Sequence, residues 1–364
     1  MASNFNPTRL SLARRRRGLT KKRLAKMVGV STWTMSAYES GAHEPSELHM
    51  KSLASELSFP LEFFGKEDVE LPSADQASFR ALSRMTAGQR DSALAASALA
   101  TELSNWIEQR FLLPPLNVPD LREVSPEMAA ESLRNEWGPG QRPIGNLIHL
   151  MEANGVRIFS LVEECNEVDA FSLWKGDNPF VFLNTRKSAE RSRFDAAHEL
   201  GHLVLHRHGA PSGRVAELEA NAFASAFLMP KADVLARSPR NASLRLIVQA
   251  KIRWGVSAMA YCHRLHDVGM LTDWHYRQLC IKISQLGHRR KEPNERQRET
   301  SQLLKKVFDL LRREGTSKAD VAKALAISPK ELDCLVFGLV LTSIEGGSLG
   351  SSIKKSKSHH LRLV

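Results

Sequence analysis

Residues 194–206 read FDAAHELGHLVLH and contain the pattern HExxH at positions 198–202. In an α-helix, residues four apart lie one above the other on the same face, so His198 and His202 can present two imidazoles to one Zn²⁺ ion. Glu199 lies beside them, where it can take a proton from a water molecule that the metal activates. Apolar neighbours indicate that this helix is buried, and two buried histidines need a partner. The pattern therefore predicts a metal-binding helix over about residues 187–207.

A third ligand is expected downstream, because a catalytic zinc ion usually has three protein ligands and one open position. The nearest acidic group is ELEAN, residues 217–221. On a helix, Glu217 and Asn221 share a face, whereas Glu219 points roughly 200° away from Glu217. An asparagine beside a ligand can also hold a histidine ring in place. We therefore favour Glu217 as the third ligand, with Asn221 as the supporting residue, and keep Glu219 as the alternative.

His206 continues the stripe of His198 and His202 along the same helix face. Eight residues of helix span roughly 12 Å, which is too far for one zinc ion with bonds of about 2 Å to reach both ends. We therefore expect His206 to lie at the end of the helix, where the helix dipole favours a basic side chain.

The composition describes an ordinary globular protein of 364 residues, enough for two or three domains. Hydrophobic residues make up 42% of the chain and charged residues 25%. We expect no membrane span and no secretory signal, because no apolar run approaches the roughly 20 residues that a span needs. The cysteines show no CxxC spacing, which argues against a disulfide framework and for a cytoplasmic protein. They are Cys165, Cys262, Cys280 and Cys334.

The formal net charge of +11 is unevenly spread. Residues 1–38 contain nine Lys and Arg residues and no acidic residue, and the densest runs are 14–17 and 21–23. A charge run is usually a solvated surface. A basic segment that also has the pattern of a folded domain is better explained by a polyanionic partner.

Short helices are predicted over residues 8–64. Thr20 and Ser31 are placed to cap the second and third helices, and Gly29 to break the chain between them. The stretch RRRRGLTKKRLAKMVGVSTWTMSAYESGAHEPS, residues 14–46, closely resembles the helix-turn-helix of the phage-repressor (Cro-like, XRE) family.

This resemblance implies that double-stranded DNA is a partner and that the third helix enters its major groove. Residues 14–17 would mainly hold the DNA backbone. Base edges or phosphates would be met by Lys21, Thr32, Trp33 and Ser36. The family more often carries a polar residue at the position of Trp33, so local packing of Trp33 is the alternative. The residues expected at the DNA are Lys21, Lys22, Thr32, Trp33, Ser36, Arg14, Arg15, Arg16 and Arg17.

The rest of the chain predicts an α+β unit followed by helices. Three short strands are expected over residues 156–161, 170–174 and 180–184, and helices follow them. Two later stretches, WGVSAMAYCHRLHDVGML and TSKADVAKALAISPKELDCLVFGLV, have a helix-turn-helix rhythm. They lack a concentrated basic surface, so we favour a packing or substrate-docking role over DNA binding.

The expected domain order follows from these patterns. It comprises a helix-turn-helix domain (1–66), a helical linker (67–122), an α+β unit (123–236), a helical C-terminal domain (237–344) and a disordered tail (345–364).

The stretch FDAAHELGHLVLH, followed by ELEANAFASAFLMP (residues 217–230), resembles the ImmA/IrrE family of zinc metallopeptidases over roughly residues 120–235. The resemblance implies a zincin-like (gluzincin) domain in which His198, His202 and Glu217 bind zinc and Glu199 is the general base. It also implies that strand 180–184 is an edge to which an extended substrate adds by β-pairing. No residue emerges as the oxyanion donor.

The combined resemblance implies a zinc-dependent hydrolase that regulates transcription. Such a protein would cleave a partner repressor in a stress response or during induction of a mobile element. The alternative is a DNA-binding regulator or antitoxin whose zinc domain senses or binds a partner without turnover. A homodimer is possible with a palindromic DNA site, and no membrane partner is expected.

Overall fold

The computed structural model describes residues 5–72, 77–79, 86–161, 170–207, 213–239, 242–289 and 291–340. Cys165 and the tail expected over residues 345–364 lie outside these ranges. The chain divides into two compact units. The first comprises Met1–Leu71, Asp91–Pro114 and Thr300–Val364, and the second comprises Pro72–Arg90 and Pro115–Glu299. This grouping by spatial contact differs from the linear segments of the sequence analysis, which placed residues 237–344 in one region.

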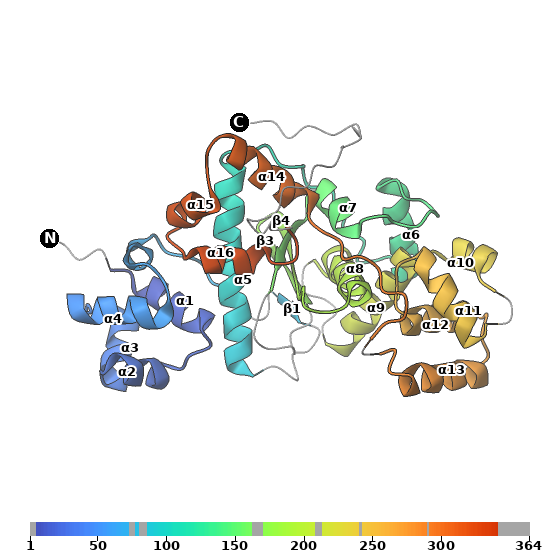
Figure 1. Ribbon diagram of the computed structural model, residues 1–364, viewed down its shortest axis with the longest axis horizontal. Helices are drawn as coiled ribbons and strands as arrows, with labels where there is room; N and C mark the ends of the chain where they lie inside the picture. Colours follow the sequence, from blue (N-terminus) through green and yellow to red (C-terminus); the bar gives the residue numbers. More distant parts are fainter. Residues whose placement is uncertain are drawn as a thin grey trace, which may run out of the picture. The chain divides into compact units, whose positions relative to one another are not determined.

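The first unit begins with the helix-turn-helix fold expected from the sequence. Its helices are α1 (Pro7–Arg16), α2 (Lys21–Val28), α3 (Thr32–Ser40) and α4 (Glu47–Leu57), followed by a 3₁₀ helix over Leu61–Gly65 (Figure 1). The Thr20 hydroxyl caps α2 and the Ser31 hydroxyl caps α3. Gly29 ends α2 with φ +77°, a left-handed conformation that favours glycine. These local signals confirm the predicted turn between α2 and α3.

Four more helices belong wholly or mostly to the first unit. They are α5 (Ala87–Glu108), α14 (Gln302–Arg313), α15 (Lys318–Ala324) and α16 (Pro329–Val336). The guanidinium group of Arg9 in α1 bonds to both carboxylate oxygens of Glu102 in α5, at 2.9 and 2.6 Å. Arg16 in α1 bonds to Glu331 in α16. Charge-assisted contacts therefore join α1 to segments that are remote in sequence.

The second unit contains a four-stranded sheet in the order β1-β3-β4-β2. The strands are β1 (Ala77–Phe79), β2 (Arg157–Ser160), β3 (Ala170–Lys175) and β4 (Asn178–Leu183). β4 pairs parallel with β2 and antiparallel with β3, and β3 pairs antiparallel with β1. The three predicted strands are confirmed, and β1 is an additional one.

The prediction that strand 180–184 is an edge is wrong. β4 has a hydrogen-bonded neighbour on each side, so the sheet ends at β1 and β2. The sequence of β4 is consistent with this position, because its residues 179–183 are all buried. A run that is apolar on both faces is typical of an internal strand.

Helices α8 (Ala189–Leu205) and α9 (Arg214–Leu228) pack closely against each other, and α8 also contacts β3 and β4 (Figure 1). Gly201 lies at the contact between the helices. A Cβ atom built there would come within 3.0 Å of the Phe223 ring and 3.2 Å of Ala220 Cα. Gly201 therefore allows α9 to approach the HExxH helix at the level of His202.

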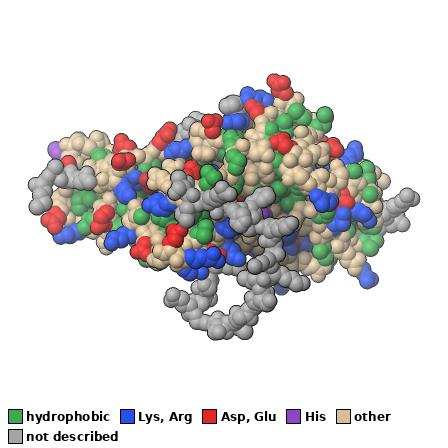
Figure 2. All heavy atoms as spheres, turned by 90° about the horizontal axis from the view of Figure 1, so that it is seen from above, with side chains coloured by type: hydrophobic (Ala, Val, Ile, Leu, Met, Phe, Trp, Pro, Cys, Tyr) green, Lys and Arg blue, Asp and Glu red, His purple; other side chains and the backbone are tan. Residues whose placement is uncertain are grey.

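Further helices complete the second unit. They are α6 (Pro126–Glu136), α7 (Leu147–Ala153), α10 (Lys231–Arg237), α11 (Leu244–Ala250), α12 (Ala258–Asp267) and α13 (Asp273–Gln285). Among the described residues, no helix is both long and apolar enough to cross a membrane. On the face shown in Figure 2, acidic and basic side chains are interspersed.

Candidate metal centre and DNA interface

The two histidines of the HExxH pattern lie on α8 as the sequence predicts. The helix begins after Ser188, whose hydroxyl accepts a hydrogen bond from Arg191 N. His198 and His202 are buried, and their Nε2 atoms are 3.1 Å apart. This separation places both ring nitrogens at one point in the interior of the unit.

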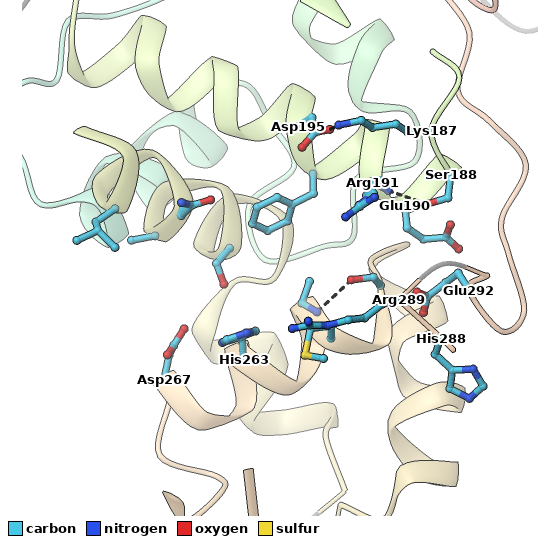
Figure 3. Close-up of a pocket in the computed structure, with 18 residues that line it drawn as sticks. Lys187, Ser188, Glu190, Arg191, Asp195, His263, Asp267, His288, Arg289 and Glu292 are labelled. Carbon is cyan, nitrogen blue, oxygen red and sulfur yellow. Dashed lines mark hydrogen bonds and ion pairs between the residues drawn. The ribbon is translucent and has the colours of Figure 1, made fainter. Parts of the chain in front are cut away.

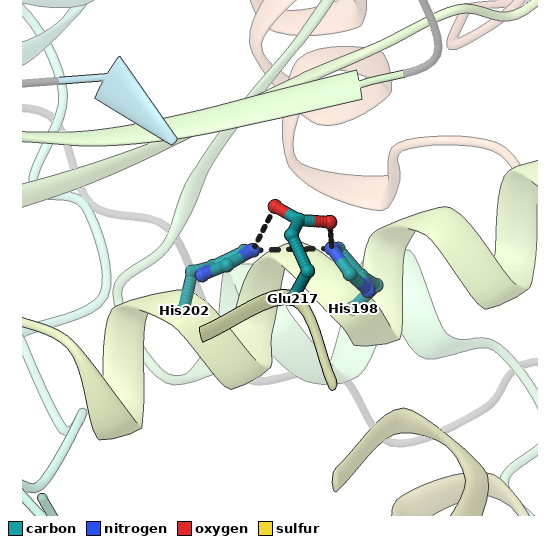
Figure 4. A group of neighbouring side chains, drawn as sticks. All are labelled: His198, His202 and Glu217. Atoms are coloured by element: carbon teal, nitrogen blue, oxygen red, sulfur yellow. Dashed lines mark hydrogen bonds and ion pairs between the residues drawn. The ribbon is translucent and has the colours of Figure 1, made fainter. Parts of the chain in front are cut away.

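Glu217 of α9 brings a carboxylate to the same point (Figure 4). Its Oε2 lies 3.4 Å from His198 Nε2, and its Oε1 lies 3.4 Å from His202 Nε2. One potential ligand atom from each residue falls within a mutual distance of 4.8 Å. Two imidazole nitrogens and one carboxylate are the protein ligands of many catalytic zinc sites, so this donor set fits zinc.

The outer nitrogen of each histidine ring has its own partner. His198 Nδ1 lies 3.1 Å from Asn221 Oδ1, which can only accept, so Nδ1 carries the proton. The amide of Asn221 in turn donates to the Glu217 carbonyl oxygen at 2.7 Å. This tautomer leaves the lone pair of His198 Nε2 directed at the metal position.

His206 supports the second ring. Its Nε2 lies 2.9 Å from the Glu219 carboxylate, and its Nδ1 lies 2.9 Å from His202 Nδ1. When His206 donates to Glu219, its Nδ1 can accept a hydrogen bond from His202 Nδ1–H, which leaves the lone pair of His202 Nε2 free to bind a metal. His206 is the C-terminal cap of α8, as expected. The structure thus brings Glu217 to the ligand group and Glu219 to His206.

Two pKa shifts favour the protonation states that a metal ion needs. Burial lowers the pKa of His202 to about 4, so its ring is uncharged at neutral pH. Partial burial opposes ionisation of Glu217, but the adjacent His198 and His202 side chains outweigh it and lower its pKa to about 2. Neutral imidazole and ionised carboxylate are the metal-binding forms of these side chains.

Glu199 lies on the sheet side of the metal centre and is fully buried. Its Oε2 accepts a 2.7 Å hydrogen bond from the hydroxyl of Ser172 in β3. Ser172 was not among the site residues expected from the sequence. Only the pairing of the strands brings it to α8, and nothing in a short apolar strand marks one serine as a partner of Glu199.

Two segments of the chain match known protein families. Residues 151–266 match the IrrE N-terminal-like domain, which is a peptidase family, and residues 10–64 match a helix-turn-helix family. The chain therefore combines a segment that matches a helix-turn-helix family with a segment that matches a peptidase-family domain. The first match includes all the residues of the metal centre, and the second includes α2 and α3. No curated protein shows a significant match to the chain.

A cavity of about 740 Å³ lies beside α8 and α9, the helices that carry the candidate ligands. It is lined by residues of α8, α9 and α12 and by His288, Arg289 and Glu292. Arg191 and Arg289 line it from different segments (Figure 3). Asn221 also lines the cavity, and it bonds to His198. Asn221 therefore connects this cavity to the candidate ligand group, although His198, His202 and Glu217 do not line it.

On the helix-turn-helix domain, α3 exposes Thr32 and Trp33 and partly exposes Ser36. The Trp33 side chain is 71% exposed, and its ring centroid lies 5.8 Å from that of His43. Lys22 of α2 is exposed, whereas Lys21 is half-buried, with Nζ 3.5 Å from Glu39. Trp33 therefore remains available to a partner and has little local packing.

The arginine run of α1 is largely engaged within the first unit. Arg14 bonds to Glu39, and both Arg16 and Arg17 bond to Glu331. Arg15 makes no ion pair within the described part of the chain. All four arginines were expected at the DNA backbone, but three of these side chains have carboxylate partners in the protein.

Proposed function

We propose that this protein is a DNA-binding zinc metallopeptidase that cleaves a partner transcriptional repressor at a specific site. One observation carries the proposal: His198, His202 and Glu217 converge on one point beside Glu199. The helix-turn-helix domain would bring this centre to proteins on DNA. Cleavage of a repressor would then couple a stress or mobile-element signal to gene expression.

The residues have distinct roles in the proposed reaction. His198, His202 and Glu217 would hold zinc, which when bound supplies Lewis-acid activation of water and of the scissile carbonyl. Glu199 would take a proton from the attacking water and deliver it to the leaving amine. Ser172 holds the Glu199 carboxylate in place. Asn221 and His206 hold the two rings in the tautomers that face the metal.

The deciding experiment compares Glu199→Gln with the wild type. Glutamine preserves the shape of the side chain and removes its proton-accepting charge. We expect equal zinc content by elemental analysis and at least about 100-fold slower cleavage of repressors encoded near this gene. Glu136→Gln, at an exposed glutamate of the same unit, should cleave at the wild-type rate. Zinc-loaded Glu199→Gln that cleaves normally would contradict the proposal.

A reporter-gene assay distinguishes the alternative function, in which the zinc domain acts without turnover. If reporter-gene regulation is normal with Glu199→Gln but is lost when Thr32 and Trp33 are substituted, the zinc domain acts without turnover. Repression would then depend on DNA binding alone.

A further inference from the structure

The edge of the sheet next to the metal centre is paired with a remote segment of the same chain. Residues Ala77, Ser78 and Phe79 form β1 and pair antiparallel with Leu173, Ser172 and Phe171 of β3. β3 has β4 on its other side. Without β1, β3 would therefore be the edge of the sheet.

β3 is also the strand that reaches the candidate general base. The Ser172 hydroxyl donates to Glu199 at 2.7 Å, and Ser78 lies opposite Ser172 in the register. In Figure 4 the pale-blue arrow of β1 lies on the side of α8 to which the Glu217 carboxylate points. The backbone of β1 therefore runs along the strand that borders the metal centre.

An exposed strand edge presents unpaired N–H and C=O groups, and an extended peptide can bind by adding to it as a further strand. The opposite edge, β2, is separated from β3 by β4. A peptide that must reach both the metal centre and a strand edge would use β3. Its backbone would require the position that residues 77–79 occupy.

We propose that the edge of β3 is the peptide-binding edge of this domain and that residues 77–79 occupy it in cis. A substrate segment binds there in an extended conformation after β1 leaves. The pairing with β1 covers only three residues, compared with six between β3 and β4. Since each ladder hydrogen bond adds little net stability, so short a strand can be displaced while the sheet remains folded. This inference rests on the proposed function only for the claim that the bound peptide is a substrate.

The test uses proline to remove β1 from the edge of the full-length, zinc-loaded protein. Successive N–H groups of a strand point to opposite sides, so either Ser78→Pro or Phe79→Pro removes a donor that faces β3. Ser78→Ala keeps the backbone donor and is the matched control. All three variants are made with Glu199→Gln to prevent cleavage.

The probe is a fluorescent synthetic peptide with the sequence of residues 72–83, PSADQASFRALS. We expect at least one proline variant to bind it about tenfold more tightly than Ser78→Ala does, as measured by anisotropy. Amide exchange of residues 171–173 should be faster in that variant and should slow again when the peptide binds. The inference is overturned if neither proline variant exceeds Ser78→Ala in peptide binding.

This outcome is independent of the proposed function. Peptide binding at the vacated edge, with no cleavage by any variant that carries Glu199, would refute the peptidase and leave the binding edge in place. Zinc-dependent cleavage that is unaffected by proline, together with no gain in peptide binding, would refute only the edge.

Discussion

The carboxylate of Glu331 lies 2.5 Å from Nε of Arg16, although 315 positions separate the two residues. Its second oxygen bonds to Arg17 at 2.7 Å. Glu331 is almost fully buried, and it neutralises Arg16 in the last turn of α1 and Arg17, the C-cap of that helix. Residues 316–340, which have a helix-turn-helix rhythm of their own, thus contribute a packing partner for α1, as the sequence analysis favoured.

Removal of Glu331 should destabilise the first unit strongly. Glu331→Ala leaves two guanidinium groups without their partner, and breaking a buried ion pair in this way costs about 3–5 kcal/mol. Asp333→Ala is the matched control, because its ion pair with Lys318 is partly exposed to solvent and should contribute at most about 1 kcal/mol. Urea unfolding of both variants measures the difference. Similar unfolding midpoints would show that Glu331 is not important for stability.

The same carboxylate predicts an acid-dependent loss of stability. Burial opposes ionisation of Glu331, but Arg16 and Arg17 outweigh it and hold its pKa below the ordinary value of 4.5. Since the folded pKa is the lower one, the stabilisation is fully present above the unfolded pKa and is lost as pH falls through the folded pKa. Between about pH 5 and pH 3, the melting temperature of the wild type should fall more than that of Glu331→Gln. Parallel melting curves in this range would contradict the linkage.

The sequence predicted the elements whose signals are local. HExxH, the serine and threonine caps and Gly29 each act within a few residues, so they located α8 and the turn between α2 and α3. The choice of Glu217 over Glu219 came from the helix face that Glu217 shares with Asn221, which can hold a histidine ring in place. The donor group found around His198 and His202 includes Glu217.

What the sequence did not reveal depends on remote pairing. The run at positions 14–17 was interpreted from charge alone, and composition does not show that Glu39 and Glu331 pair with three of its arginines. Ser172 reaches Glu199, and β1 reaches β3, only through strand register. The internal position of β4 likewise depends on which strands flank it. A three-residue strand such as β1 has no periodicity from which it could be predicted.

Asn221 should affect metal affinity through the His198 ring. Asn221→Leu removes the acceptor for His198 Nδ1, and loss of such a partner weakens metal binding by about 10- to 100-fold. Asn221→Asp retains an acceptor oxygen and should stay within about threefold of the wild type. Competition with a zinc chelator measures both constants. The interpretation fails if the leucine variant binds zinc as tightly as the aspartate variant.

Glu217 and Glu219 should respond differently to the same substitution. Glu217→Ala removes one of the three candidate ligands and should abolish stoichiometric zinc binding. Glu219→Ala removes only the partner of His206, so the protein should retain zinc with about tenfold lower affinity. Elemental analysis after gel filtration gives the stoichiometry of each variant. Loss of zinc from Glu219→Ala alone would reverse the assignment.

The salt dependence of DNA binding should follow the exposed lysines of the helix-turn-helix domain. Each phosphate that a lysine neutralises adds about 0.9 to the slope of log affinity against log salt, because a counterion is released. Lys22 is exposed on α2 and has no carboxylate partner in the described part of the chain. We expect Lys22→Ala to lower the slope by about one on a mixed-sequence duplex. Lys51 is exposed on α4 but paired with Glu47, so Lys51→Ala should leave the slope unchanged. Equal slopes for Lys22→Ala and the wild type would place the DNA on another surface.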